Sequence, residues 1–262
     1  MNKYTVAFIN EHDDLIDNNQ IEELFDLMNK ERNRQSIAQD LSSALYSIGI
    51  HVWEYDVPYG LVTLNDVTFQ DPIILKSKNG ELPTFTNCTF YDLTLDAPDV
   101  EKFNSYGTTI KELTFSSTCT MIPTINCKVM ENVVIPSNIT EISNRAFADY
   151  SGSIVIPNTV EILHSGVFYS SAVRHVELSE SLDMIPSRCF DYCTVLESIT
   201  IPSSIDYIGR DAFVYTPALK QIIYKGTREQ WENVFIYRGA FNDSALEEVV
   251  CSDGTLKFKK SK

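Results

Sequence analysis

The sequence predicts an α/β solenoid, a stack of short coils that share one parallel β-sheet and one apolar interior. A short strand-like segment, often ending in proline, recurs at intervals of 21–23 residues. A phenylalanine follows each of four such segments in the same part of the unit. A fixed period in the low twenties is typical of a solenoid. The segments begin at Val133, Ile154, Val176, Ile199 and Ile222, and the phenylalanines are Phe147, Phe168, Phe190 and Phe213.

Apolar residues hold the same positions in every unit. Two inward residues flanking one outward residue predict a short strand. Proline ends the pairing because it has no N–H. The next apolar residues are three apart, which suits a tight helical or 3₁₀ turn, and the phenylalanine then closes the turn over the core. The apolar columns are Ile139, Val160, Leu182 and Ile205, then Ile142, Leu163, Ile185 and Ile208.

Residues 1–58 differ in pattern and predict a small αβ unit. Strands are expected at Thr5–Ile9 and Ile50–Tyr55, because both segments are rich in apolar and β-branched residues. Helices are expected around Ile21–Met28 and Ile37–Ile48, where apolar residues share one helical face. The unit either caps the solenoid or docks the protein onto its own assembly.

The solenoid is expected over residues 59–225. Residues 59–130 read as irregular coils without the phenylalanine column, and residues 131–225 as regular ones. Residues 226–262 predict a C-terminal cap and a basic tail, KKSK. Thr227-x-x-Gln230 can begin a capped helix that lays Trp231 and Val234 on the last coil. Asp253-Gly254 predicts a hairpin over Val249–Phe258.

The stretch CFDYCTVLESITIPSSIDYIGRDAF, residues 189–213, resembles the BspA-type leucine-rich repeat, also called the Treponema pallidum type. The close match covers about residues 110–258. Ser179 departs from it by replacing the proline, and the turn cysteine is replaced at three positions, Tyr150, Ser171 and Thr216. The resemblance implies a parallel sheet face and binding to a protein or a host surface. The matching residues are Leu196, Ile199, Ile201, Pro202, Ile205, Ile208, Ala212, Phe213 and, in the preceding turn, Cys193.

Composition argues against several functions. The formal charge of −15 disfavours nucleic acid, since acidic surfaces repel phosphate. No apolar run is long enough for a membrane span, and no signal peptide is recognisable, so we expect a cytoplasmic protein or a virion component. The six cysteines are irregularly spaced and read as buried free thiols. No metal, cofactor or catalytic motif is expected.

The outward positions of the strands form the candidate binding surface. If the residues flanking them point inward, two rows of side chains face outward along the sheet. Solenoids use such faces to bind extended partners. Val134 and Val155, which are apolar and in adjacent coils, favour this use. The first row is Glu112, Asn132, Ser153, His175, Ser198 and Gln221, and the second is Thr114, Val134, Val155, Glu177, Thr200 and Ile223.

These observations favour a non-enzymatic module that binds a protein or host-surface partner through the sheet face, as a phage virion component docked through residues 1–58. The alternative is a cytosolic adaptor or inhibitor of a host protein. A remote alternative is an enzyme that uses the N-terminal unit, with His12, His51 and Asp13 lining a pocket.

Overall fold

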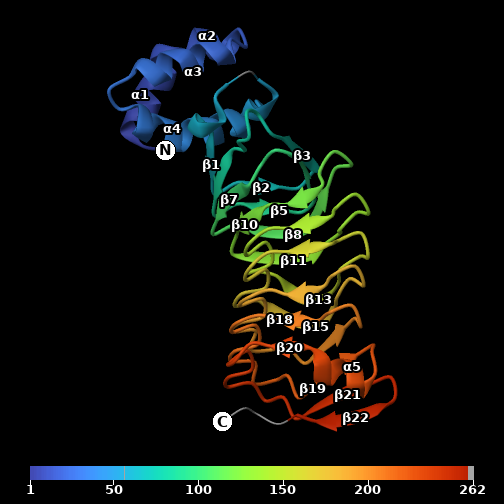
Figure 1. Ribbon diagram of the computed structural model, residues 1–262. Coiled ribbons are helices and arrows are strands. Elements are labelled where there is room, and N and C mark those ends of the chain that lie inside the picture. The colour runs from blue at the N-terminus through green and yellow to red at the C-terminus, as the bar shows by residue number, and fades with distance from the viewer. Residues whose placement is uncertain (56, 259–262) are drawn as a thin grey trace.

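The computed structural model describes residues 1–55 and 57–258. Its coils stack into an elongated solenoid, with helices at the N-terminal end and a short helix and hairpin at the other (Figure 1). Buried side chains from residues 8 to 251 form one connected apolar core. The solenoid predicted from the repeat is confirmed.

The N-terminal unit is helical, so the prediction of an αβ unit is wrong. Segment Thr5–Ile9 lies inside α1, and Ile50–Tyr55 contains the 3₁₀ turn η1 (Val52–Glu54) where a strand was expected. The expected helices are present, although Ile48 lies beyond the second one and is exposed. The four helices are α1 (Lys3–Glu11), α2 (Asp13–Asp17), α3 (Ile21–Lys30) and α4 (Arg34–Ser47).

A side-chain cap explains why the first segment is helical. Asn2 Oδ1 accepts hydrogen bonds from the backbone N–H groups of Tyr4 (3.0 Å) and Thr5 (3.1 Å). Amide groups at a helix start otherwise lack partners, so this cap favours the helix. Thr5 and Phe8 then fall on one face and are buried.

The helical unit covers the first coil. Helix α4 packs along β1 (Thr63–Asn65), and the Asn65 N–H donates to Ser43 Oγ at 2.7 Å. A second 3₁₀ turn, η2 (Tyr59–Leu61), connects the unit to β1. The helices therefore act as a cap, while docking onto an assembly stays a prediction.

The irregular coils predicted over residues 59–130 contain parallel strands on more than one side. Phe69 and Phe90 stack inside them with ring centroids 4.4 Å apart. One ladder runs β1–β4–β7–β10 and a second joins β2, β5, β8, β6, β3 and β11. Their bounds are β2 (Thr68–Phe69), β3 (Ile73–Lys76), β4 (Thr84–Thr86), β5 (Thr89–Phe90), β6 (Leu93–Asp96), β7 (Lys102–Tyr106), β8 (Thr109–Phe115), β10 (Thr124–Asn126) and β11 (Val129–Val133).

The regular coils carry one long ladder, whose outward surface, together with that of β8 and β11, we call the sheet face. It runs β13–β15–β17–β19–β21, and the antiparallel β22 closes it. Inward residues of these strands are buried, as Ile199 and Ile201 are in β17. The strands are β13 (Ser151–Val155), β15 (Ala172–Glu177), β17 (Ser198–Ile201), β19 (Gln221–Tyr224), β21 (Glu248–Cys251) and β22 (Gly254–Lys257).

The other side of each regular coil carries a two-residue strand, so the expected helical or 3₁₀ turn is wrong there. The second apolar column lies in these strands, each of which pairs with the equivalent strand of at least one neighbouring coil. His164 and Gly209 donate backbone hydrogen bonds across the coils, at 2.9 and 2.8 Å. Pro186 holds the equivalent position without an N–H, so the strands form two groups. They are β9 (Met121–Ile122), β12 (Glu141–Ile142) and β14 (Ile162–Leu163), then β16 (Met184–Ile185), β18 (Tyr207–Ile208) and β20 (Phe235–Ile236).

The phenylalanine column forms a stack through the core. Phe147 and Phe168 have ring centroids 5.3 Å apart, and Phe168 and Phe190 lie 5.1 Å apart at an interplanar angle of 7°. The stack continues through Phe213 to Phe241, whose centroids are 4.9 Å apart. The side chains are at most 7% exposed, so the predicted shared interior is confirmed.

The C-terminal cap has the predicted form. Helix α5 (Arg228–Asn233) begins with a capping box between Thr227 and Gln230. Trp231 packs edge-on against Tyr224 with centroids 5.1 Å apart, which covers the last coil. The hairpin β21–β22 follows. The basic tail, residues 259–262, lies outside the described residues.

Candidate functional site: the sheet face

The structure places all twelve predicted site residues on the outside of the sheet. None of them is buried, whereas the residue between the two rows in each strand is buried or packs against the core. Parallel pairing aligns Glu112 with Asn132, and His175 with both Ser153 and Ser198. The second row is aligned in the same way, with Glu177 between Val155 and Thr200.

The face is divided into two parts, because the ladder is interrupted between β11 and β13. Only an isolated bridge, Met130 with Tyr150, links the two strands. The interruption falls where the spacing of equivalent strand residues grows from 20 to 21 residues and the first phenylalanine turn enters the chain. On the opposite side, β12 pairs with both β9 and β14, so the stack itself continues. The continuous face expected from the spacing is therefore split beside Val134 and Val155.

Downstream of the interruption, polar side chains on the face bind one another between coils. His175 Nδ1 lies 2.9 Å from Ser198 Oγ, and Gln221 Nε2 donates to Glu248 Oε1 at 2.7 Å. Lys225 Nζ donates to Glu177 Oε1 at 3.0 Å. This hydrogen bond and a second, to Glu180, raise the pKa of Lys225. These side chains therefore already have hydrogen-bond partners within the protein.

On both sides of the interruption itself, the face is open. The side chains of Glu112, Asn132 and Ser153 are exposed and have no hydrogen bond or ion pair within the described part of the chain. Val134 and Val155 are 62% and 63% exposed. The arrangement offers one exposed apolar side chain in each of two consecutive coils, together with polar side chains that have no partner among the described residues. That is the character of a protein-binding surface: an apolar centre with a polar rim.

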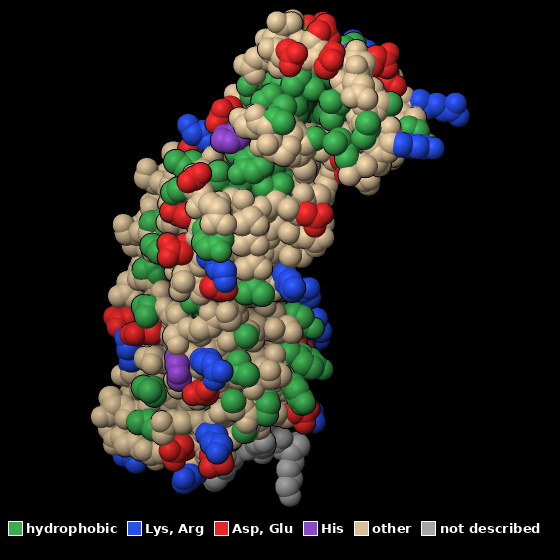
Figure 2. Space-filling model, turned by 180° about the vertical axis from the view of Figure 1, so that it is seen from behind, with side chains coloured by type: hydrophobic (Ala, Val, Ile, Leu, Met, Phe, Trp, Pro, Cys, Tyr) green, Lys and Arg blue, Asp and Glu red, His purple; other side chains and the backbone are tan. Residues whose placement is uncertain are grey.

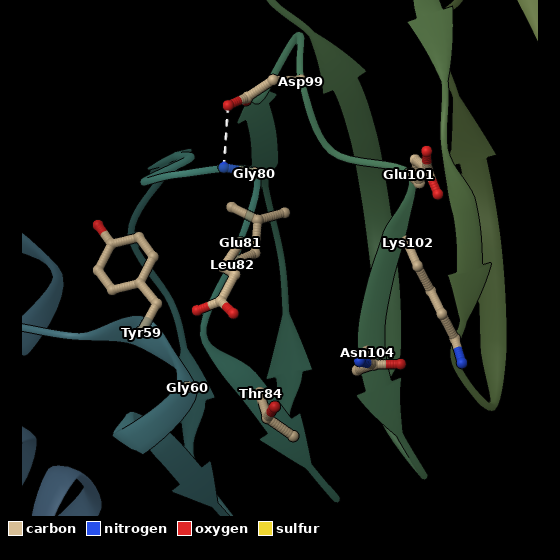
Figure 3. A pocket seen from close by; sticks show the side chains of 10 residues that line it. All are labelled: Tyr59, Gly60, Gly80, Glu81, Leu82, Thr84, Asp99, Glu101, Lys102 and Asn104. Carbon is tan, nitrogen blue, oxygen red and sulfur yellow. Dashed lines mark hydrogen bonds between the residues drawn. The ribbon is translucent and has the colours of Figure 1, made fainter.

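A hollow of about 400 Å³ lies over the early coils near η2, apart from the sheet face (Figure 3). Tyr59 and Glu81 line one side, and Lys102 and Asn104 the other. Asp99 accepts hydrogen bonds from Ser77 Oγ and, at 2.9 Å, from the Gly80 N–H, and these bonds lower its pKa. This hollow could not be predicted from the sequence, because its residues come from η2, a turn and two different coils.

The groups considered for catalysis lie apart from this hollow. His12 Nδ1 lies 2.9 Å from the Phe8 carbonyl oxygen on α1. The ring of His51 stacks against Tyr46 and Trp53, at 5.4 and 5.1 Å. Neither histidine lines the hollow. Within residues 1–55 and 57–258, no group of three or more His, Cys, Asp or Glu side chains could hold a metal ion.

The cysteines are free, as predicted, and five of the six are buried, while Cys127 is half-buried. Burial raises the pKa of Cys127 and of Cys193 to about 12. A thiol with so high a pKa is a poor nucleophile at neutral pH, because the thiolate is the reactive form.

Sequence reasoning missed the outward residues of the short strands, a second exposed surface. Three of them are large apolar residues that are at least 40% exposed: Ile162, Met184 and Phe235. The signal was available, since each directly precedes a second-column residue, or its equivalent Ile236, in the repeat.

The repeats match a known family. Residues 125–247 match the model of the BspA type leucine rich repeat region, in six copies. No curated protein matches the sequence. None of the helices in the described ranges is long and apolar enough to cross a bilayer.

Two solved structures are similar to the chain. A leucine-rich repeat protein from Bacteroides ovatus ATCC 8483 is 14% identical with a TM-score of 0.38, covering 71% of this chain and 65% of that one. The chain therefore spans less than two thirds of that protein. A leucine rich cell surface protein from Faecalibacterium prausnitzii A2-165 is 13% identical with a TM-score of 0.28, covering 72% and 88%.

The six copies overlap the regular coils and carry the Phe147–Phe213 stack. This repeat family suggests a protein-interaction module and is typically non-catalytic. Residues 125–247 of this chain are a BspA-type leucine-rich repeat region.

Proposed function

We propose that the chain is a non-enzymatic protein-interaction module whose sheet face binds a protein partner. The observation that carries the proposal is the exposure of Val134 and Val155, at equivalent positions of consecutive coils, where the ladder is interrupted. Valine suits an exposed strand position, and a partner that covers the two valines would in addition remove their apolar surface from water.

The polar surroundings support the same use. Asn132 and Ser153 flank the valines and leave donors and acceptors unoccupied. A partner strand or loop can bond to these groups without displacing internal contacts, in contrast to the downstream half, where His175 and Glu177 already have partners. We therefore place the centre of the interface on β11 and β13 and its rim at Glu112 and Thr114.

The experiment compares matched variants in a binding assay. The immobilised chain is incubated with lysate of its native source, and the retained protein is identified and titrated as purified material. Val134→Lys with Val155→Lys should weaken binding at least about tenfold, because two charges enter the apolar centre. Ile48→Lys is the control, since Ile48 is 61% exposed at the end of α4, away from the face. Equal binding by the double variant and the wild type would refute the sheet face as the site.

The same proposal includes two alternative locations for the protein, a virus particle and the cytosol. A virion component docked through residues 1–58 and a cytosolic adaptor or inhibitor both use the sheet face in this way, and each stays a prediction. Detection of the chain by mass spectrometry in purified particles distinguishes the first from the second.

A further inference from the structure

The short strands on the other side of the solenoid present a row of apolar side chains to solvent. The exposed fractions are 49% for Ile162, 40% for Met184 and 60% for Phe235, and Tyr207 is half-buried between the last two. Pairing aligns Met184 with Tyr207 and Tyr207 with Phe235. The rings of Tyr207 and Phe235 are parallel to within 6°, with centroids 5.4 Å apart. We call these four residues the apolar row.

The fold does not require apolar residues at these positions. In the preceding coil Glu141 holds the same place, aligned with Ile162, and its carboxylate pairs with His164. Single exposed apolar residues are ordinary, but a contiguous row marks a contact surface. The view from behind shows hydrophobic side chains gathered along one side of the C-terminal half of the solenoid (Figure 2).

A row of carboxylates runs beside the apolar row. Glu161, Asp183 and Asp206 each directly precede one of its residues, and all three are exposed. The Asp206 N–H donates to the Asp183 carbonyl oxygen at 3.0 Å, so the two residues lie in adjacent coils. We call these three the acidic row. None of its carboxylates has a hydrogen bond or ion pair with any described residue.

Like charges in adjacent strands oppose folding unless a cation offsets them. The nearby arginines on this side of the coils are already engaged. Arg188 Nε lies 3.8 Å from Asp211 Oδ2, and Arg210 donates to Tyr237 Oη at 2.7 Å. The acidic row is therefore free to pair with cations of a partner molecule.

We propose that the apolar row and the acidic row together bind a basic amphipathic helix of a partner protein, lying along the solenoid axis. Its apolar side covers Met184, Tyr207 and Phe235, and its Lys or Arg side chains meet Asp183 and Asp206. This surface is separate from the sheet face, and the proposal does not depend on the one made for that face.

The spacing of the coils selects a helix over an extended chain. Adjacent strands are about 4.8 Å apart, so the carboxylates repeat at that interval. Helix residues three and four apart advance about 4.5 and 6.0 Å along the axis. Residues on the same side of an extended chain are about 6.6–6.8 Å apart. This spacing exceeds that of the coils, so such residues no longer lie opposite the carboxylates after three coils. Helical Lys side chains can thus follow the acidic row from Asp183 to Asp206, whose coils are paired.

The test uses a fluorescent synthetic helix of Leu, Ala and Lys, with Leu on one face and Lys at successive i, i+3 and i+4 positions beside it. Its binding to the full chain is followed by anisotropy. Asp183→Lys with Asp206→Lys should weaken binding at least about tenfold, and Met184→Ser with Phe235→Ser should do the same. A peptide of the same composition in scrambled order should bind at least about tenfold more weakly.

The control is Asp13→Lys with Asp14→Lys, which changes the net charge equally on α2. An equal loss in this control would overturn the proposal, because it would show attraction to net charge alone. Full binding by the acidic-row variant, or by the scrambled peptide, would also overturn it. Thermal unfolding verifies that each variant is folded. If a lysine variant unfolds, Asp183→Asn with Asp206→Asn replaces it, and unchanged binding by that folded protein would be equally fatal to the proposal.

Discussion

The rings of Phe190 and Phe213 lie 5.1 Å apart at an interplanar angle of 12°, although each closes the turn of a different coil. Both side chains are fully buried. Because each ring contacts the coil before and the coil after it, the stack couples neighbouring repeats. A change at one ring is therefore expected to act on more than its own coil.

Phe190→Ala should destabilise the protein by about 3–5 kcal/mol, the usual range for emptying a buried phenylalanine site. The physical reason is a cavity between Phe168 and Phe213, which rigid neighbouring coils cannot fill. Urea unfolding followed by far-UV circular dichroism measures the effect. Phe235→Ala is the control, since Phe235 is 60% exposed, and should change stability by less than about 1 kcal/mol. Similar losses in both variants would mean that the stack contributes no special stability.

Gly209→Ala should also destabilise the chain, by about 1–3 kcal/mol. A Cβ at Gly209 would lie 2.6 Å from the Ser187 nitrogen and 2.9 Å from the Pro186 carbonyl carbon, both in the backbone of the preceding coil. Neither atom can move without opening the contact between coils. At Gly60 the nearest atom to an added Cβ is the Glu81 side chain, at 3.6 Å, so Gly60→Ala should be nearly neutral. Thermal unfolding of the two variants compares them directly, and equal melting temperatures would contradict the close approach.

Much of the solenoid could be predicted from the sequence, because buried columns repeat with the coil. Ile205, Ile208 and Phe213 each recur one unit apart and are buried as expected. The N-terminal strands were predicted wrongly, since a short apolar run such as Val6–Ile9 suits a helix or a strand equally well. What decided between them was the cap supplied by Asn2.

The sequence predicted which residues of the candidate site face outward, but not the interruption of the strand ladder beneath them. Alternation along each strand places Val134 and Val155 outward, and the structure agrees. The interruption falls where the coil length changes, and its effect on pairing depends on three-dimensional packing. The apolar row was missed because Ile162, Met184 and Phe235 share exposure and size without sharing identity.

Asp191 should make stability depend on pH. Its side chain is 6% exposed and its Oδ1 has no partner among the described residues. Burial raises the pKa of this carboxyl, Arg188 opposes the shift, and Asp211 adds to it. The folded protein thus holds the proton more tightly than the unfolded chain does, so stability falls as pH rises from about 3.9 through the raised pKa.

Asp191→Asn removes this titration. The variant should be more stable than the wild type at neutral pH, with the difference shrinking towards about pH 3.5, where the carboxyl is protonated in both states. Asp253 is the control of opposite sign, because hydrogen bonds from Arg228 lower its pKa. Asp253→Asn should lose a little stability at neutral pH. Urea titrations across the range measure both, and a wild-type advantage over Asp191→Asn at pH 7 would contradict the assignment.

The thiols should be inert until the solenoid opens. Burial raises the pKa of Cys193 to about 12, and its Sγ lies 2.9 Å from the Phe168 carbonyl oxygen, inside the core. A disulfide reagent such as DTNB at pH 8 should leave the native protein almost unmodified and should react with all six cysteines in urea. Ser153→Cys, at an exposed site on the sheet face, is the control and should react at once. Because the reaction of native thiols requires opening, the logarithm of its rate should rise in Phe190→Ala in proportion to the lost stability, about tenfold for each 1.4 kcal/mol. Rapid modification of the wild type would show that the coils separate without unfolding.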